Sequence, residues 1–430
     1  PLVAISLTRV NVADFFKETV VVVTNPAIDR ERERAQFSTT MLVGARPEIG
    51  QAAGENATLI QLETPLLLGG HPDLGAIEDL RVVADRHGTL VLEELLDVFG
   101  ERATILHASA ALDETIQSAV ERLQRAAVQA VLEGSQCLVI DDSDAIAGAR
   151  LLIDPLLLTA AIDQALRGAG GTPNLRRQVG LVVRSGALRD LHDLALCVGL
   201  GANALAPYAL YAVGLGIAPR APKQPPTSEQ VIERLNNTVT ALTHGLQKVT
   251  STIGCHELRG YGQAFSAVGL APSVAAIFGT PNYFGSEQHG LKWSDLARDA
   301  AERASELRGE KTSRLDNPDR FYPKMWKKIE DIAHGELSLD DYTDIMLRLE
   351  SEMPVAPRHL LGLKTAEGDI DPAEVDISIA GYAMPAVIGA MSFGSQGELS
   401  YKAYGEAAYR LNIICVNGEG GELPEVMGKY

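Results

Sequence analysis

The stretch CLVIDDSD (Cys137–Asp144) decides the fold, because it predicts a short buried strand that ends on acidic residues. The stretches RATILHAS (Arg102–Ser109) and VGLVVRSG (Val179–Gly186) are also strand-like, and Ala202–Leu205 predicts the next strand. Helical patterns separate these strands. Strands that alternate with helices of about a dozen residues indicate parallel pairing through right-handed crossovers. The predicted fold class is therefore α/β, with parallel βα units.

The predicted helices place polar residues at the strand ends. The helical patterns cover Leu112–Gly134, Leu156–Leu166 and Leu188–Gly199. Functional groups in such layers belong at the carboxyl ends of the strands. Asp141, Asp142, Arg184 and Ser185 occupy these positions.

Composition and charge exclude several classes of protein. The chain has 430 residues, 46% of them hydrophobic and 22% charged, which fits two or three globular domains. Its net charge of −18, without a basic stripe in the sequence, disfavours nucleic-acid binding. The cysteines form no CxxC pair, so we expect no zinc or iron–sulfur ligand run, and four buried thiols in a reducing cytoplasm. They are Cys137, Cys197, Cys255 and Cys415.

One long stretch, Leu194–Ala218, carries no charge and is long enough to cross a bilayer. Its glycines and Pro207 favour a buried strand with turns instead, so we expect no membrane span. The chain begins at Pro1 rather than Met, which leads us to expect a processed start or a longer polypeptide.

Composition shifts divide the chain into three parts. We expect a first domain over residues 1–290, with a Pro-rich linker near 218–230 that precedes the helix Val231–Val249. Residues 291–365 predict a polar helical connector. Inside it, NPDRFYPKMWKKIEDI mixes aromatic residues with lysines, but the acids that follow favour a solvated connector over a nucleic-acid contact. Residues 366–430 predict a third, apolar unit.

The third unit ends in two glycine-containing loops. MPAVIGAMSFGS (Met384–Ser395) predicts a strand and a Ser/Gly turn, Glu398–Leu411 predicts a helix, and NIICVNGEGGE predicts a second strand. The first turn either lets a flat ligand approach the backbone or only turns the chain. The second loop fits neither a P-loop nor a Rossmann turn, because its acids repel phosphate. Such acids bind an amine, accept a proton or hold a basic neighbour, unless the loop is a plain exposed turn.

The sequence contains no recognisable metal-ligand or nucleophile motif. The nine histidines show no metal-like i,i+4 pairing, and no cysteine lies in a nucleophile motif. We therefore predict neither a metal site nor a hydrolase.

Several long motifs resemble one family. DFFKETVVVVTNPAIDRERE (Asp14–Glu33) resembles the D-Y-F-K … V-T-N-P-P-I-D-P-x-R-E signature of the central domain of glutamate synthase large subunits. Val179–Leu210 is similar to the family's G-L-V-V-E-S-G … N-P-Y segment, and GQAFSAVGL with FGT (Gly262–Leu270, Phe278–Thr280) to G-A-Q-I-F-E-A-V-G-L … F-x-G-T. GAMSFGS and GEGGE resemble motifs that open the family's flavin-binding barrel. These matches span nearly the whole chain in the family's order.

This resemblance implies a glutamate synthase-like central domain, a helical connector, and an incomplete first part of a (β/α)8 barrel that binds FMN. The family's complete enzyme condenses 2-oxoglutarate with ammonia, which a glutaminase domain or subunit releases from glutamine, and reduces 2-iminoglutarate to L-glutamate. It also carries an iron–sulfur cluster, whose ligands this segment lacks. Electrons come from an NADPH-linked subunit or ferredoxin. We expect a cytoplasmic oligomer that binds neither nucleic acid nor membrane, in which this segment alone is inactive.

The resemblance also implies roles for individual residues. Glu419 would be catalytic and face the imine or ammonia, and Ser395 and Glu422 would bind the substrate. Ala390, Met391 and Ser392 would lie against the flavin, and Thr24 and Asn25 near the ammonia path.

Some polar positions depart from the family motifs. Val416 and Asn417 stand where Asn and Thr are usual, Ala206 replaces an Asn, and Gly260 and Ser266 fall where Arg and Glu are expected. These changes leave a second hypothesis, a non-catalytic assembly module that keeps the central domain for subunit contacts.

Overall fold

The computed structural model describes residues 11–18, 29–47, 50, 57–147, 150–170, 174–217, 226–262, 264–310, 325–352, 361–362, 364, 368, 371–381, 386–389, 396–417 and 421–429. The chain divides into two compact units, Pro1–Leu360 and Leu361–Tyr430. The domain boundaries proposed from the sequence remain a prediction.

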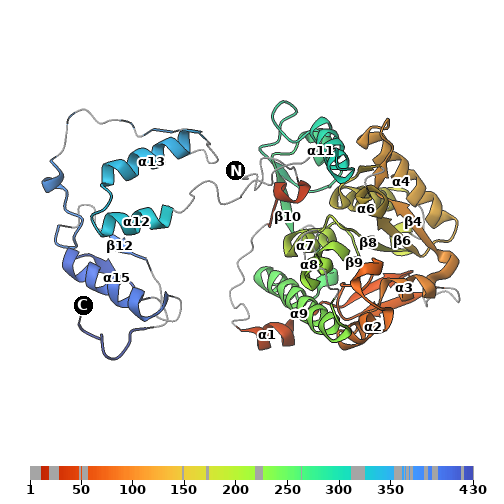
Figure 1. Ribbon diagram of the computed structural model, residues 1–430, viewed down its shortest axis with the longest axis horizontal. Helices are drawn as coiled ribbons and strands as arrows, with labels where there is room; N and C mark the ends of the chain where they lie inside the picture. Colours follow the sequence, from red (N-terminus) through yellow and green to blue (C-terminus); the bar gives the residue numbers. More distant parts are fainter. Residues whose placement is uncertain are drawn as a thin grey trace. The chain divides into compact units, whose positions relative to one another are not determined.

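A four-stranded parallel sheet forms the centre of the first unit (Figure 1). Its strands are β4 (Ala103–His107), β6 (Cys137–Asp141), β8 (Gly180–Arg184) and β9 (Ala204–Ala206), in the order β4-β6-β8-β9. All neighbouring pairs are parallel. The strands alternate with α4 (Ile116–Leu132), α6 (Pro155–Gly168) and α7 (Leu191–Gly199). The α/β class and the parallel βα units predicted from the sequence are confirmed.

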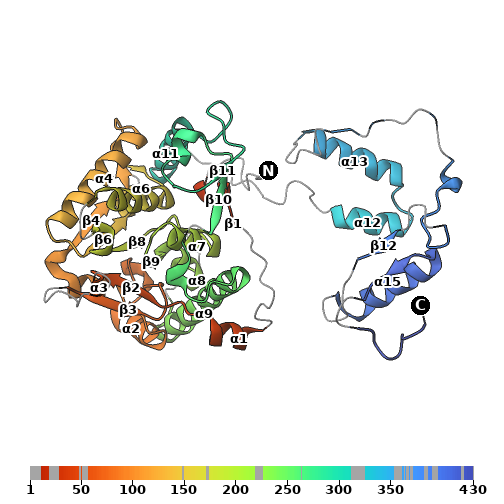
Figure 2. The same cartoon turned by 180° about the vertical axis from the view of Figure 1, so that it is seen from behind.

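The alternation of side chains gives this sheet two buried faces. Leu138 and Ile140 of β6 belong to the large core that includes α4, α6 and α7. Cys137 and Val139 point to the other face and pack with residues of β2 (Met41–Gly44), β3 (Leu59–Leu62) and α3 (Leu92–Phe99). Figure 2 shows α4 and α6 on one side of the sheet and β2, β3 and α3 on the other. Every residue of β6 is buried, which explains its continuous apolar run.

An early segment of the chain extends the sheet beyond β9. Leu66 forms a parallel bridge to Leu205, and Leu68 forms one to Val91. The amide of Leu67 donates to the carbonyl of Leu205 at 2.8 Å, and the amide of Leu205 donates to the carbonyl of Pro65 at 2.7 Å. The antiparallel pair β2 and β3 and this extension were not predicted.

The first unit contains further helices and strands. α9 (Ser228–Ile253) begins at Thr227 with a capping box to Gln230, close to the predicted start. A second sheet has the order β1-β10-β11. α11 (Trp293–Leu307), placed by sequence in the connector, contacts β7 and α4. The other elements are α1 (Arg30–Gln36), α2 (Ile77–Arg86), α5 (Ser143–Ile146), α8 (Tyr208–Leu215), α10 (Pro272–Ala275), α12 (Met325–Ala333), α13 (Leu339–Glu352), β1 (Phe16–Glu18), β5 (Ser109–Ala110), β7 (Leu151–Leu152), β10 (Phe265–Val268) and β11 (Asn282–Tyr283).

The second unit contains one βα unit and the strand after it, as predicted. β12 (Val387–Ile388) and β13 (Ile414–Cys415) pair in parallel, and α15 (Glu398–Leu411) connects them. These described strands form a two-stranded sheet rather than a closed barrel.

Two expectations about apolar residues have different outcomes. Residues 194–217 of the stretch Leu194–Ala218 form part of α7, then β9 and α8, and Ala218 lies outside the described residues. None of the helices in the described ranges combines the length and the apolar character that crossing a bilayer requires. Cys137 and Cys197 are buried, but Cys255 is half-buried and Cys415 is exposed, so the expectation of four buried thiols was wrong. Cys415 ends β13, whose two residues are both exposed.

Candidate functional site

Two predicted loops begin at the same edge of the second unit's sheet. In the parallel pair β12 and β13, Val387 lies opposite Ile414 and Ile388 opposite Cys415. The amide of Val416 donates to the carbonyl of Ile388 at 3.2 Å. Because both strands point the same way, the GAMSFGS and VNGEGGE segments leave from one edge. The structure therefore brings together the starts of the two loops singled out by the sequence.

The helix α15 returns the chain from the first loop to the second strand. It ends at Asn412, whose left-handed backbone (φ 51°) caps the helix with hydrogen bonds to Ala408 and Tyr409 carbonyls. Tyr401 and Ala408 are its buried residues. They are two turns apart on the helix, which places them on one face.

A cavity of about 340 Å³ lies between this helix and the two strand ends. Tyr401, Tyr404 and Tyr409 of α15 line it together with Gly389, which follows β12. Three further lining residues come from the segment after β13: Val416, Asn417 and Glu422. The walls therefore combine aromatic rings and glycine with a few polar groups, a composition typical of small-molecule sites.

Glu422 is the acid of this cavity. Burial raises the pKa of the Tyr401 phenol, and the negative charge of Glu422 raises it further. Burial and Glu422 together also raise the pKa of the Cys415 thiol. The carboxylate thus lies within electrostatic reach of the helix and of the strand end, where it favours protonated neighbours and cationic ligands.

The cavity fits one part of a flavin nucleotide better than the other. Tyrosine rings and a glycine without a side chain suit a flat apolar ring system. Its lining residues within the described ranges include no lysine or arginine. The phosphate of FMN would therefore need partners outside this wall, whereas the ring can be held here.

Most of the residues singled out by sequence lie outside the described residues. These are Thr24, Asn25, Ala390, Met391, Ser392, Ser395 and Glu419. Glu422 is described and lines the cavity. Sequence reasoning missed Tyr401 and Tyr404, although their i,i+3 spacing on a predicted helix directly after the first loop was an available signal.

A second polar cluster lies at the carboxyl ends of β6 and β8, where the sequence predicted it. Arg184 donates to Asp141 at 3.0 Å and to the carbonyl of Gly70 at 2.7 Å. Its guanidinium lies 5.7 Å from the ring centre of Tyr208. These contacts tie β8 to β6, to the segment that follows Leu68, and to α8.

Asp142 is the most enclosed member of this cluster, with 0% exposure. Its carboxylate accepts hydrogen bonds from the Ser185 hydroxyl at 2.5 Å and the Tyr208 hydroxyl at 2.9 Å. The amides of Gly186 and Ala187 donate to it at 3.0 and 3.3 Å. Burial raises the pKa of Asp142, and the hydrogen bonds from Ser185, Gly186 and Tyr208 oppose the increase. Four donors around one buried carboxylate fix the loop after β8.

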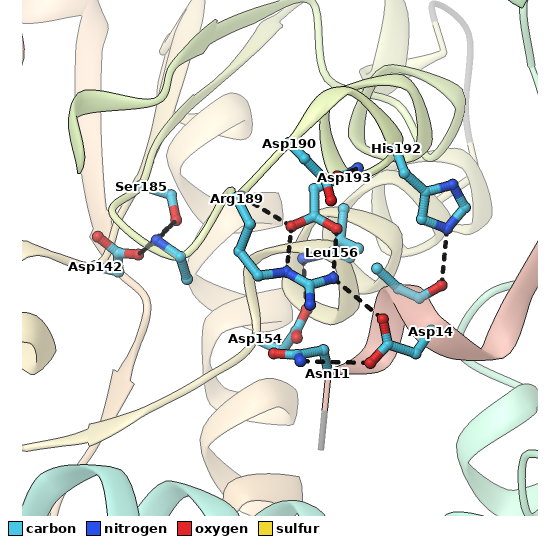
Figure 3. Close-up of polar contacts among 12 residues, drawn as sticks. Asn11, Asp14, Asp142, Asp154, Leu156, Ser185, Arg189, Asp190, His192 and Asp193 are labelled. Carbon is cyan, nitrogen blue, oxygen red and sulfur yellow. Dashed lines mark hydrogen bonds and ion pairs between the residues drawn. The ribbon is translucent and has the colours of Figure 1, made fainter. Parts of the chain in front are cut away.

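The loop that Asp142 fixes borders another cavity, of about 330 Å³. Gly186, Ala187, Arg189 and Asp154 line it, together with residues of α11. Figure 3 shows the two nitrogens of Arg189 on Asp193, at 2.8 and 2.9 Å, and a further contact to Asp14. Burial raises the pKa of Asp154, which caps α6, to about 6. The charged groups of this wall are used in internal contacts, which indicates a structural role.

Comparison with known proteins assigns the chain to a family. Residues 1–271 match the family described as glutamate synthase central domain. The chain belongs to this family. The match covers the four-stranded sheet, α9 and the β10 strand.

Relatives in the glutamate synthase family align well beyond the central domain. A ferredoxin-dependent glutamate synthase from Arabidopsis thaliana is 29% identical over 99% of this chain, and one from Pyropia yezoensis is 27% identical over 96%. The NADPH glutamate synthase large chain of Bacillus subtilis is 25% identical over 99% of this chain. This chain covers 26%, 26% and 27% of those three proteins, so it spans about a quarter of the length of the curated relatives it matches.

Similarity to solved structures is weaker. An IMP dehydrogenase/GMP reductase-like protein from Corynebacterium glutamicum superposes with a TM-score of 0.35 at 11% identity, covering 60% of this chain and 94% of that one. That score is too low to indicate a common fold.

Three departures from the glutamate synthase motifs lie in ordered parts of the central domain. Ala206 ends β9 and is 0% exposed, and Ser266 lies in β10 at 8% exposure. Gly260 ends the short helical turn Leu258–Gly260. The other two departures, Val416 and Asn417, line the cavity of the second unit.

Proposed function

We propose that this chain supplies the central domain and the first part of the FMN-binding barrel of a glutamate synthase-type oxidoreductase. The complete enzyme would reduce 2-iminoglutarate, formed from 2-oxoglutarate and ammonia, to L-glutamate. The family match over residues 1–271 carries the proposal, because relatives in that family continue to align through both glycine loops. The cavity between α15 and the two strand ends is consistent with it.

Within this proposal each loop has a separate task. Ala390, Met391 and Ser392 would offer small side chains and backbone to the flavin ring, and Ser395 would bind the oxo-acid. Glu419 would face the imine or the arriving ammonia, and Glu422 would hold the same region negative. Reduced FMN, when bound, would supply a hydride, which carries the two electrons of the reduction. An acidic wall favours the cationic nitrogen over a phosphate or a second carboxylate.

Partners from outside this segment complete the reaction. A glutaminase domain or subunit would release ammonia from glutamine, which would pass near Thr24 and Asn25. An iron–sulfur cluster bound by other parts of the protein would carry electrons to the flavin. The donor would be ferredoxin or an NADPH-linked subunit, since relatives of both kinds align with this chain. We propose a cytoplasmic oligomer.

The test uses the intact protein that contains this chain. We expect a yellow flavin spectrum and formation of glutamate from 2-oxoglutarate with glutamine or ammonia. Glu419→Gln should lower kcat by about 10²-fold or more, as loss of a positioned proton-transfer group does. Glu425→Gln, a change of the same charge at an exposed residue of the same segment, is the matched control. An intact protein with neither flavin nor glutamate formation contradicts the proposal.

The departures from the family motifs favour one alternative, a non-catalytic assembly module. Asn417 replaces a usual threonine in the cavity itself, and Ala206 removes a polar group from the end of β9. This alternative predicts normal subunit contacts without flavin. Restoring the motif by Asn417→Thr should leave a module inactive, whereas in an enzyme it would alter kcat or KM.

A further inference from the structure

A cavity in the first unit has walls that are mainly apolar. It is the cavity of about 330 Å³ that borders the loop after β8. Its apolar lining residues include Ile116 of α4, Ile146 of α5, Leu152 of β7, Leu157 of α6, and Leu296 and Ala300 of α11. A smaller apolar cavity, of about 150 Å³, is enough to hold a benzene molecule. This cavity, which we call the α11 cavity, is therefore large enough for a ring with a short substituent.

The α11 cavity lies at the carboxyl edge of the central sheet. Gly186 and Ala187, which line it, follow the end of β8, and Ile146 belongs to the helix that follows β6. The amides of Gly186 and Ala187 donate to the buried Asp142, so this part of the wall is held in place. Ligands of open parallel α/β sheets bind outside the carboxyl ends of the strands. The α11 cavity therefore lies where such a sheet places a ligand.

The two arginines that line the α11 cavity already have partners. Arg189 donates to Asp193 at 2.8 and 2.9 Å. Arg303 donates to Asp299 at 2.5 Å and to the side chain of Asn11 at 3.0 Å. Because carboxylates of the protein already accept from both guanidinium groups, neither arginine needs an anionic ligand to balance its charge.

Asp154 offers the α11 cavity a hydrogen-bond acceptor. One of its oxygens, Oδ1, caps α6 by accepting from the amides of Leu156 and Leu157 at 2.9 and 3.3 Å (Figure 3). Within the described ranges, no residue donates a hydrogen bond to the other oxygen, Oδ2. Asp154 is half-buried and lines the cavity, so a ligand there can reach it. The missing partner of Oδ2 is a donor.

We propose that the α11 cavity binds a small primary amine with an apolar body, and that the ammonium group donates to Oδ2 of Asp154. The apolar body would contact the walls formed by α4, α6 and α11. An ammonium on a carboxylate forms a charge-assisted hydrogen bond, which is stronger than a bond between neutral groups. A carboxylate ligand is disfavoured, because it would face Asp154 while the arginines of the wall keep their own partners.

The ionisation of Asp154 agrees with this ligand class. Burial raises the pKa of Asp154 to about 6, so the carboxyl is mostly ionised at pH 7.5 although burial disfavours its charge. An ammonium beside it would offset that cost. The site is independent of the proposed synthase reaction, because none of its residues lines the cavity beside Glu422. Failure of the amine to bind would therefore leave the proposed reaction untouched.

Isothermal titration calorimetry of the full chain at pH 7.5 tests the proposal with three probes that share a ring: benzylamine, benzyl alcohol and benzoate. We expect benzylamine to bind at least about tenfold more tightly than benzyl alcohol, and benzoate to bind most weakly. Asp154→Asn should weaken benzylamine at least about tenfold, because the amide oxygen keeps the helix cap and the NH₂ group replaces Oδ2. The hydroxyl of benzyl alcohol can donate or accept, so its affinity should change little.

Asp97→Asn, at an exposed residue of α3, is the matched control for the loss of charge. It should bind benzylamine like wild type. The proposal is overturned if benzylamine does not bind, if benzoate binds more tightly than benzylamine, or if Asp154→Asn keeps the wild-type affinity for benzylamine. It is equally overturned if Asp97→Asn loses as much affinity as Asp154→Asn.

A second variant tests the place of binding without changing a charge. Ala300 is 3% exposed and lines the cavity, so Ala300→Leu puts a larger side chain into the space that the ring would occupy. It should weaken benzylamine and benzyl alcohol at least about tenfold. Ala301→Leu, the same change at an exposed residue of the same helix, should leave both affinities unchanged. Circular dichroism confirms that the variants are folded, and a folded Ala300→Leu protein with wild-type affinity for benzylamine overturns the proposal.

Discussion

Removing the hydroxyl of Tyr208 tests whether Asp142 holds the carboxyl edge of the central sheet. Tyr208 is 5% exposed and Asp142 0% exposed, and their hydrogen bond is 2.9 Å long. Tyr208→Phe deletes this bond. The ring should remain in place, because it stacks on His71 with ring centres 5.6 Å apart. The change is therefore confined to one donor.

The expected loss of unfolding free energy depends on the charge of the acceptor, the carboxylate of Asp142. A hydrogen bond to a charged group contributes about 1.5–3 kcal/mol, against about 0.5–1.5 kcal/mol for a neutral pair. Asp142 keeps its donors from Ser185, Gly186 and Ala187. We therefore expect Tyr208→Phe to lower the free energy of unfolding by about 2 kcal/mol. In an Asp142→Asn background the same change should cost only about 1 kcal/mol, which leaves a coupling near 1 kcal/mol.

Urea denaturation of the four proteins in this cycle, followed by circular dichroism, gives the coupling. A shift in midpoint at constant slope reports stability alone. Because the Tyr208 hydrogen bond opposes the raised pKa of Asp142, its loss raises that pKa further. The cost of Tyr208→Phe should therefore shrink as the pH falls and the carboxyl becomes protonated in both proteins. A cost below about 0.5 kcal/mol, or one that is equal in both backgrounds, would refute the reasoning.

Three further predictions concern the first unit, and denaturation curves check each of them. Arg176→Met should cost about 3–5 kcal/mol, because the buried carboxylate of Asp163 loses its main partner. Burial raises the pKa of Asp154 to about 6, so the protonated carboxyl stabilises the folded state. This contribution is fully present below about pH 4 and is lost as the pH rises through about 6. Asp154→Asn keeps the helix cap and should abolish this loss, which amounts to up to about 3 kcal/mol. Gly201→Ala should cost about 2 kcal/mol or more, since its Cβ would lie 2.5 Å from Asp163, whereas Gly134→Ala meets no neighbour within 4 Å and should cost less.

The βα units of the fold were predictable because their signal is local. Cys137–Asp141 is buried on both faces and appears in the sequence as a continuous apolar run between helical patterns. The pairing of Leu66 with Leu205 was not predictable, because it depends on a long-range contact rather than on periodicity. The same limit applies to β2 and β3, whose short strands cover a sheet that comes later in the sequence.

Part of the candidate site was also predictable from the sequence, and part of it was not. Parallel strands fix where their following loops begin, so the meeting of the segments after Ile388 and Cys415 followed from the predicted βα unit. Tyr401 and Tyr404 offered only their i,i+3 spacing on a helix as a signal, and the packing of that helix places them in the cavity wall.

The bridge between Leu66 and Leu205 has a consequence for how the chain folds during synthesis. The units from β4 to β9 pair in sequence order, so each can dock on the previous one as it leaves the ribosome. The segment around Leu66 must instead wait about 140 residues for its partner strand, and closing so large a loop costs entropy before the contact forms. The segment around Leu66 is therefore made before β4 to β9 but reaches its native packing only after β9 has been made.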